Sequence, residues 1–185
     1  IHLNEIAIKT LDDGSVWGRV FYHKNNGGTT LFTSASEVLH TTSTDKFSRL
    51  DWLPYFKGHH EKYEFLLNFK EISGRDSLAD KYNRWKQTNA PQDERKADNN
   101  SSAYVDGYEA IAISWNDNYW GGLGRQNDDI NTIAWCCIDG SIGHGNWFYA
   151  IGAYSSHDGG TPGPSSGVAE TELWVRLDTN MKFFK

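Results

Sequence analysis

The side chains best suited to ligand binding gather at an aromatic pair in the second half of the chain. Tyr119 and Trp120 come directly after Asp117 and Asn118 and directly before Gly121-Gly122. A flat ring can stack on the apolar C–H face of a sugar, while amide and carboxylate groups bind its hydroxyls. We expect these four side chains to line a carbohydrate-binding site, with the glycines leaving room for the ligand. For any single tryptophan, burial in the core is the commoner alternative.

A second polar turn adds a histidine and another tryptophan. Two apolar runs, 131–138 and 146–151, flank a centre of Asp, Gly, Ser, Ile, Gly, His and Gly. This layout predicts a strand, a turn and a strand, with His144 and Trp147 presented at the turn. Asp139, Ser141 and His144 have the residue types of a catalytic triad. However, they lie within six positions of one turn, where they could not orient one another, and we predict no catalysis.

Oxygen-bearing side chains also suggest a calcium site. Asp117 lies in one turn, and Asn127, Asp128 and Asp129 lie in another a few positions later. Calcium binds several carboxylate and carbonyl oxygens from loops, so these four residues are candidate ligands. The spacing matches no EF-hand, and solvated turn residues are the simpler interpretation.

Two further features bear on where the protein works. Asn99 and Asn100 each begin a glycosylation sequon within a polar stretch, which favours an exposed loop of a secreted protein. Cys136 and Cys137 are adjacent and cannot form a disulfide framework. We expect two buried thiols, with a strained ring between the two cysteines or a bond to another chain as the alternatives.

Length and charge limit the class of protein. The chain has 185 residues, which fits a single domain over 1–185. Its 18 Lys and Arg stand against 24 Asp and Glu, giving a formal net charge of −6. An acidic surface argues against binding nucleic acid through a basic patch. Insertion into a membrane is not expected either, because no apolar run reaches the length of a membrane span.

The elements that must position these residues are mostly strands. Short apolar or alternating runs separated by Asp-Gly, Asn-Gly and Asn-Asp turns are typical of strands. The predicted strands are 5–8, 16–22, 29–33, 63–69, 108–115, 132–138, 146–151 and 170–178. A helical turn is expected over 47–53, ending at Pro54, and a helix competes with a strand over 77–87. The pattern predicts an all-β fold, an antiparallel β-sandwich or jelly roll with one or two short helical turns.

Several segments together resemble a family of mostly uncharacterised extracellular β-rich modules. The resemblance covers about 61–178 and rests on segments spread through that range. They are 82–88, 107–111, 119–123, 138–141, 145–152 and 172–176. The last of these, Glu172-Leu173-Trp174-Val175-Arg176, also resembles the closing strand of galactose-binding-like and laminin-G-like sandwiches. The resemblance implies an extracellular β-sandwich and carries over no catalytic residue.

Two functions from different classes follow. The first is an extracellular, lectin-like module that binds carbohydrate without catalysis, with calcium as a candidate cofactor. The second is a structural subunit of an extracellular fibre, filament or coat that assembles from copies of itself. The expected partners are therefore glycans or further copies of the chain.

Overall fold

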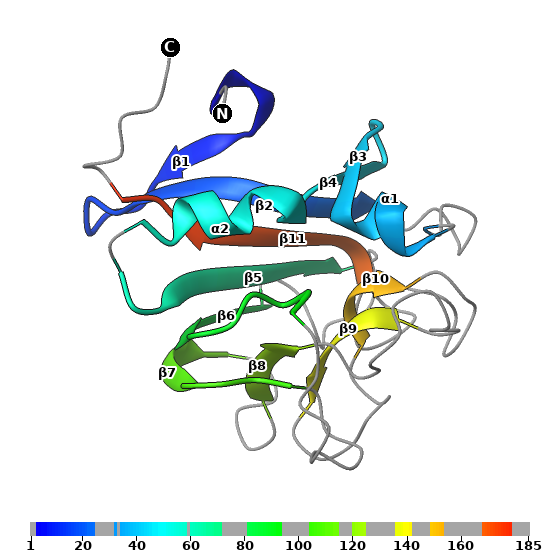
Figure 1. Cartoon of the computed structure of the whole chain (residues 1–185). Coiled ribbons are helices and arrows are strands. Elements are labelled where there is room, and N and C mark those ends of the chain that lie inside the picture. Colours follow the sequence, from blue (N-terminus) through cyan, green and yellow to red (C-terminus); the bar gives the residue numbers. More distant parts are fainter. Residues whose placement is uncertain are drawn as a thin grey trace.

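The computed structural model describes residues 3–24, 32, 34–58, 60–71, 81–93, 104–114, 120–124, 136–141, 149–153 and 168–178. Within these residues the chain forms one large and one small antiparallel sheet (Figure 1). The large sheet has the strand order β3-β4-β2-β11-β5-β6-β7, and β1 pairs with β2. Its strands are β1 (Ile8–Thr10), β2 (Val16–Lys24), β3 (His40–Thr42), β4 (Lys46–Arg49), β5 (Tyr63–Glu71), β6 (Lys81–Gln87), β7 (Glu109–Ile113) and β11 (Val168–Arg176).

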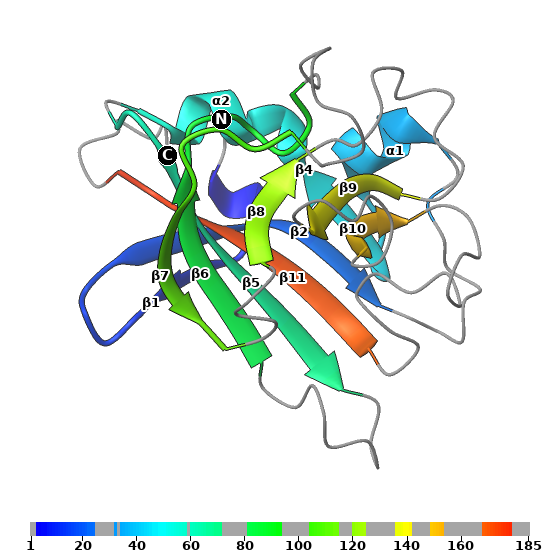
Figure 2. The same ribbon diagram turned by 90° about the horizontal axis from the view of Figure 1, so that it is seen from below.

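The small sheet and the helices lie over one face of the large sheet (Figure 2). The small sheet has the order β10-β9-β8. Its strands are β8 (Trp120–Gly124), β9 (Cys136–Ser141) and β10 (Tyr149–Ala153). The helical segments are the 3₁₀ turns η1 (Leu3–Glu5) and η2 (Leu50–Trp52) and the helices α1 (Ala35–Leu39) and α2 (Leu53–Phe56). The predicted all-β, antiparallel class with short helices is confirmed, while its closer description as a sandwich or jelly roll stays a prediction.

Several element boundaries differ from those expected. The helical turn lies at 50–56 instead of 47–53, and Phe47 belongs to β4. Pro54 does not end the helix: it occupies the first turn of α2, where its missing N–H has no partner to lose. Residues 3–5 form η1, and the first strand begins at Ile8. Of the ambiguous stretch 77–87, residues 81–87 form the strand β6.

The large sheet has two chemically different faces because side chains alternate along each strand. On the covered face of β5, Phe65, Leu67 and Phe69 join the main hydrophobic core. The next strand to β5, β11, contributes Leu173 and Val175 to the same core, as its alternation predicts. The opposite face, here called the outer face, carries charged and amphipathic residues over a small apolar cluster of Trp17, Leu66 and Trp174.

One buried amide joins the two sheets. The Gln87 side chain, at the end of β6, is fully buried. Its Nε2 donates to the carbonyl oxygens of Leu123 at 2.7 Å and Asn89 at 2.9 Å. Its Oε1 accepts from Trp85 Nε1 at 2.7 Å and from the Leu123 backbone N–H at 2.9 Å. Gln87 thus completes the hydrogen bonds of β8 from within β6.

The Gln87→Ala variant should unfold at markedly lower urea concentration. It leaves several buried donors and acceptors without partners, which we expect to cost about 3 kcal/mol. Gln92→Ala is the matched control, because the half-buried Gln92 amide donates one hydrogen bond, to the Leu50 carbonyl at 2.8 Å. That control should lose about 1 kcal/mol. Equal losses in the two variants would contradict the joining role of Gln87.

Candidate functional site

Trp120, which we expected to line a sugar-binding site, lies in the hydrophobic core. Trp120 is 2% exposed and belongs to the main core, where its ring packs edge-on against Trp85 with centroids 5.2 Å apart. The space beside Gly122 is also filled. A Cβ there would lie 2.7 Å from Gln87 Oε1 and 3.0 Å from Trp85 Nε1, and φ is +89°. The glycine thus permits close packing of β8 on β6, where we had expected room for a ligand.

The other predicted site residues lie outside the residues that the structure describes. These are the remaining sugar-binding candidates Asp117, Asn118, Tyr119, His144 and Trp147, the calcium candidates Asp117, Asn127, Asp128 and Asp129, and the sequon residues Asn99 and Asn100. Cys136 and Cys137 begin β9, and their state stays a prediction. Of the predicted site, the described structure therefore places Trp120 alone.

A different set of side chains, which the sequence did not single out, comes together on the outer face. Cross-strand pairing aligns them in rows. Trp17 pairs with Arg176, and Glu64 pairs with Lys86, which pairs with Glu109. In the next row Trp174 pairs with Leu66, which pairs with Arg84. Rows of this kind bring together residues from β2, β11, β5, β6 and β7 that lie far apart in the sequence.

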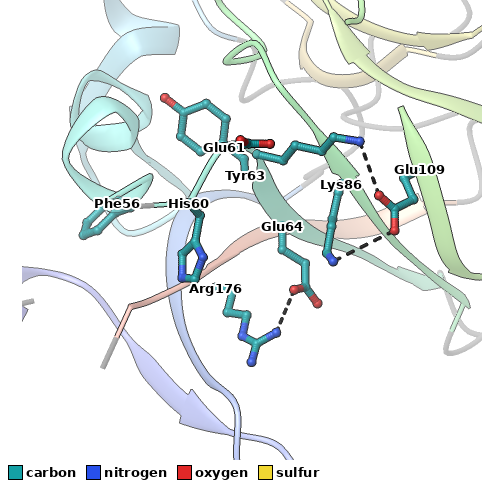
Figure 3. Close-up of a pocket in the computed structure, with 9 residues that line it drawn as sticks. Phe56, His60, Glu61, Tyr63, Glu64, Lys86, Glu109 and Arg176 are labelled. Carbon is teal, nitrogen blue, oxygen red and sulfur yellow. Dashed lines mark hydrogen bonds and ion pairs between the residues drawn. The ribbon is translucent and has the colours of Figure 1, made fainter. Parts of the chain in front are cut away.

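Three hollows open on this part of the surface. The first, of about 600 Å³, lies where β5 begins and β6 and β11 end (Figure 3). It is lined by Phe56, His60, Glu61, Lys62, Tyr63, Glu64, Lys86, Glu109 and Arg176. The second, of about 500 Å³, lies under the β1–β2 hairpin. It is lined by Lys9, Thr10, Leu11, Asp12, Asp13, Leu66, Asn68, Tyr82, Arg84 and Ala112.

The third hollow links the other two. It measures about 300 Å³ and shares His60 and Arg176 with the first hollow and Asp13 with the second. The three hollows therefore adjoin one another, and together they are here called the outer trough. An elongated trough of this kind suits an extended ligand better than a compact one. Each hollow has the size of an ordinary small-molecule site.

Glu64 is the charged centre of the trough. Its side chain is 7% exposed and accepts hydrogen bonds on both oxygens. One oxygen lies 2.6 Å from Arg84 Nη2, and the other lies 2.9 Å from Arg176 Nη1. Arg84 continues the network to Asp13 on the hairpin, with Nη1 3.1 Å from the carboxylate. A buried carboxylate held by two guanidinium groups fixes the positions of both arginines.

A second carboxylate arranges the cations at the end of the trough. Glu109 lies between two lysines, with Lys62 Nζ at 3.3 Å and Lys86 Nζ at 4.0 Å (Figure 3). These side chains are considerably more exposed than Glu64. The trough therefore offers water-facing donors and acceptors beside its buried ionic centre.

Aromatic rings contribute in two ways. Trp17 and Trp174 are buried and covered by cations: the Arg84 guanidinium lies 5.1 Å from the Trp17 ring, and Lys9 Nζ lies 4.0 Å from the Trp174 ring. Tyr82, in contrast, is 41% exposed on the wall of the hairpin hollow. Its backbone N–H donates to Ser114 Oγ at 2.7 Å, which holds the strand in place. Among the described residues of the trough, Tyr82 is the exposed tyrosine, and the imidazole of His60 is a second exposed ring.

At the hairpin end of the trough, the carboxyl group of Asp13 has a lowered pKa. The pKa of Asp13 is lowered from 3.8 to about 2, first by hydrogen bonds from the Ser15 hydroxyl and backbone N–H and then by Arg84. The Ser15 hydroxyl in turn accepts from Trp17 Nε1 at 2.7 Å. Burial lowers the pKa of Lys9, against the raising effect of Glu172. Asp13 therefore remains an ionised acceptor far into the acid range.

Sequence reasoning missed this surface for an identifiable reason. From the sequence, 77–87 fits either a helix or a strand, and 63–69 is predicted as a strand. Both descriptions fit the local chemistry of Tyr82, Arg84 and Glu64, but neither shows that the segments are adjacent. The period-two alternation of β5 and β6 was the available signal, and it becomes informative once the two strands are known to pair.

The chain has no match among the protein-family models, the curated proteins or the solved structures with which it was compared. The resemblance to galactose-binding-like and laminin-G-like modules thus stays an expectation. Within the described part of the chain, no helix is long and apolar enough to cross a membrane. Those same residues contain no cluster of three or more His, Cys, Asp or Glu suited to a metal ion.

Titration of Asp13 tests the hairpin end of the trough. In the native protein its carboxyl signal, followed by NMR, should change near pH 2. Because the pKa is lower in the folded state, the stabilisation by the Ser15 contacts is present above pH 3.8 and lost as the pH falls through about 2. Ser15→Ala should raise the pKa toward 3.8, and Arg84→Gln should raise it less. A native value near 3.8 would show that these contacts do not form.

Proposed function

We propose that the protein is a carbohydrate-binding module that holds a glycan chain along the outer trough, without catalysing a reaction on it. The observation that carries this proposal is the series of three adjoining hollows at the outer face and its edge, which charged and polar side chains line together with apolar ones. A glycan presents many hydroxyl groups along an extended chain. A long surface that alternates donors and acceptors matches that chemistry better than a single deep cavity would.

The chemistry of the lining supports a sugar ligand. Arg84 and Arg176 supply donors, Asp12 and Asp13 supply acceptors, and Asn68 supplies both. Apolar contact for the C–H faces of a sugar comes from the exposed Tyr82 ring and from Leu11 and Leu66 beside it. These groups stand mainly on paired strands and are ordered before a ligand arrives, which lowers the entropic cost of binding.

The ionic centre favours binding over catalysis. A glycosidase needs one carboxylic acid that can give a proton and a second carboxylate across the bond to be cleaved. Both oxygens of Glu64 already accept hydrogen bonds from arginines, and Glu109 is shared by two lysines. Such groups suit the role of fixed acceptors. The proposal that the module works outside the cell rests on the sequons at Asn99 and Asn100.

Glycan binding should depend on Tyr82. On an array of immobilised oligosaccharides, with and without a calcium chelator, the wild type should bind, and Tyr82→Ala should weaken binding of the best ligand about tenfold. A lost stacking contact of about 1 kcal/mol or more accounts for that change. The melting temperature should hardly change, because the hydrogen bonds of Tyr82 to Ser114 are made by its backbone.

Tyr55→Ala is the matched control. Tyr55 is 60% exposed on α2, does not line the trough, and should affect neither binding nor stability. Equal affinity of the two variants would place the glycan elsewhere. Failure of the wild type to bind any glycan would refute the proposed function.

A structural subunit of a self-assembling fibre or coat is the second candidate, and one observation favours it. Among the described strands, β7 pairs with β6 on one side only, and its Ile111 is 41% exposed. A free edge with an exposed apolar side chain can add a strand from another copy. In that case the mass measured by light scattering should rise with concentration, and Ile111→Lys should abolish the rise. A monomer at all concentrations would exclude this candidate.

A further inference from the structure

We infer that the outer trough selects uncharged glycans and rejects sulfated or uronic-acid polyanions. This inference rests on the proposed function and concerns the class of ligand at the same site. It follows from how the charges of the trough are compensated. Six carboxylates line the three hollows: Asp12, Asp13, Glu61, Glu64, Glu109 and Asp178. Five cations face them: Lys9, Lys62, Arg84, Lys86 and Arg176.

In both arginines, guanidinium N–H groups already form hydrogen bonds to carboxylates of the protein. The Arg84 guanidinium contacts Glu64 at 2.6 Å through Nη2 and Asp13 at 3.1 Å through Nη1. Arg176 contacts the second oxygen of Glu64 at 2.9 Å. A sulfate or carboxylate is recognised by a guanidinium fork that is free to form two parallel hydrogen bonds. At Arg84 an incoming anion would have to displace Asp13 or the almost fully buried Glu64. Arg176 is about half exposed and bound through Nη1 alone, and there an anion would meet a charge that Glu64 already compensates.

Each of the three lysines has a partner as well. Lys62 and Lys86 share Glu109, and the Lys9 ammonium lies 4.0 Å from the centre of the Trp174 ring. A cation over an aromatic face is stabilised without a counter-ion. The whole chain also carries a formal net charge of −6. At long range the protein therefore repels a polyanion, and at short range each lysine of the trough already has a carboxylate or an aromatic ring as a partner.

An uncharged sugar is not repelled by the net charge and does not have to displace a carboxylate from an arginine or a lysine. A hydroxyl group both donates and accepts, so it can bind a carboxylate and a neighbouring guanidinium without separating them. The ion pairs of the trough then serve as a ready-made set of alternating acceptors and donors. Because no counter-ions are released from such a ligand, its affinity should depend only weakly on salt, unlike that of a polyanion held by lysines and arginines.

The test compares two classes of ligand on the wild-type protein. Neutral oligosaccharides and heparin-type sulfated or uronic-acid oligosaccharides of equal length are titrated at low and at physiological salt. We expect the neutral class to bind at least tenfold more tightly, with little change between the two salt concentrations. Tighter binding of the sulfated class would overturn the inference and leave the proposed function standing. Failure of both classes to bind would refute the proposed function, and this inference with it.

A charge-matched pair of variants tests the cause. Glu109→Gln leaves Lys62 and Lys86 without their carboxylate and should raise the affinity for sulfated oligosaccharides at least threefold, with new salt dependence. Glu170→Gln changes the net charge equally but unpairs Lys70, which lies outside the trough. It should leave that affinity near the wild-type value. Equal gains in the two variants would mean that net charge alone decides, and would overturn the compensation argument.

Discussion

The arrangement of this protein depends on the hydrogen bonds of the buried Gln87 side chain. Gln87 lies at the end of β6, and Leu123 lies in β8, which belongs to the other sheet. The Gln87 side chain forms hydrogen bonds to both the N–H and the carbonyl oxygen of Leu123, through its oxygen and its nitrogen respectively. The same oxygen holds the Trp85 indole, which packs against Trp120. A buried amide with all these partners tolerates little displacement, since each lost bond would leave a desolvated polar group. It therefore fixes where the small sheet lies on the large one.

This constraint explains why the sequence suggested a site at Trp120 and the structure shows a core. Tyrosine, tryptophan and glycines next to polar residues are typical of an exposed binding loop. The same residue types also suit a buried strand that packs closely on a tryptophan and a glutamine, because glycine leaves space for those two side chains. A Cβ at Gly124 would lie 1.8 Å from the carbonyl oxygen of Tyr104, so the backbones themselves are in contact there. Residue types alone do not distinguish these cases, because the partners, Trp85 and Gln87, are more than thirty positions away.

Local patterns predicted the strands well where burial on one face is strict. The alternation along 170–178 puts Leu173, Val175 and Leu177 on one face, and all three are buried in the core. The predicted runs for β2, β5 and β7 lie close to the observed strands. The pattern failed where local and tertiary preferences compete. The helical spacing predicts a turn that ends at Pro54, although Pro54 lies in the first turn of α2, and 77–87 fits either a helix or a strand. The outer trough could not be predicted because its rows arise from pairing between distant strands.

The two faces of β6 show how the core and the candidate site depend on each other. Arg84 and Tyr82 point to the trough, while Trp85 and Gln87 point to the core. A slip of one residue in the pairing of this strand would exchange the two sets, burying a guanidinium and exposing a tryptophan. The hydrogen bonds of Gln87 on one face and the Arg84–Glu64 ion pair on the other oppose the same slip. The charge network that we propose as part of a glycan-binding surface thus also helps to hold the register on which its own geometry depends.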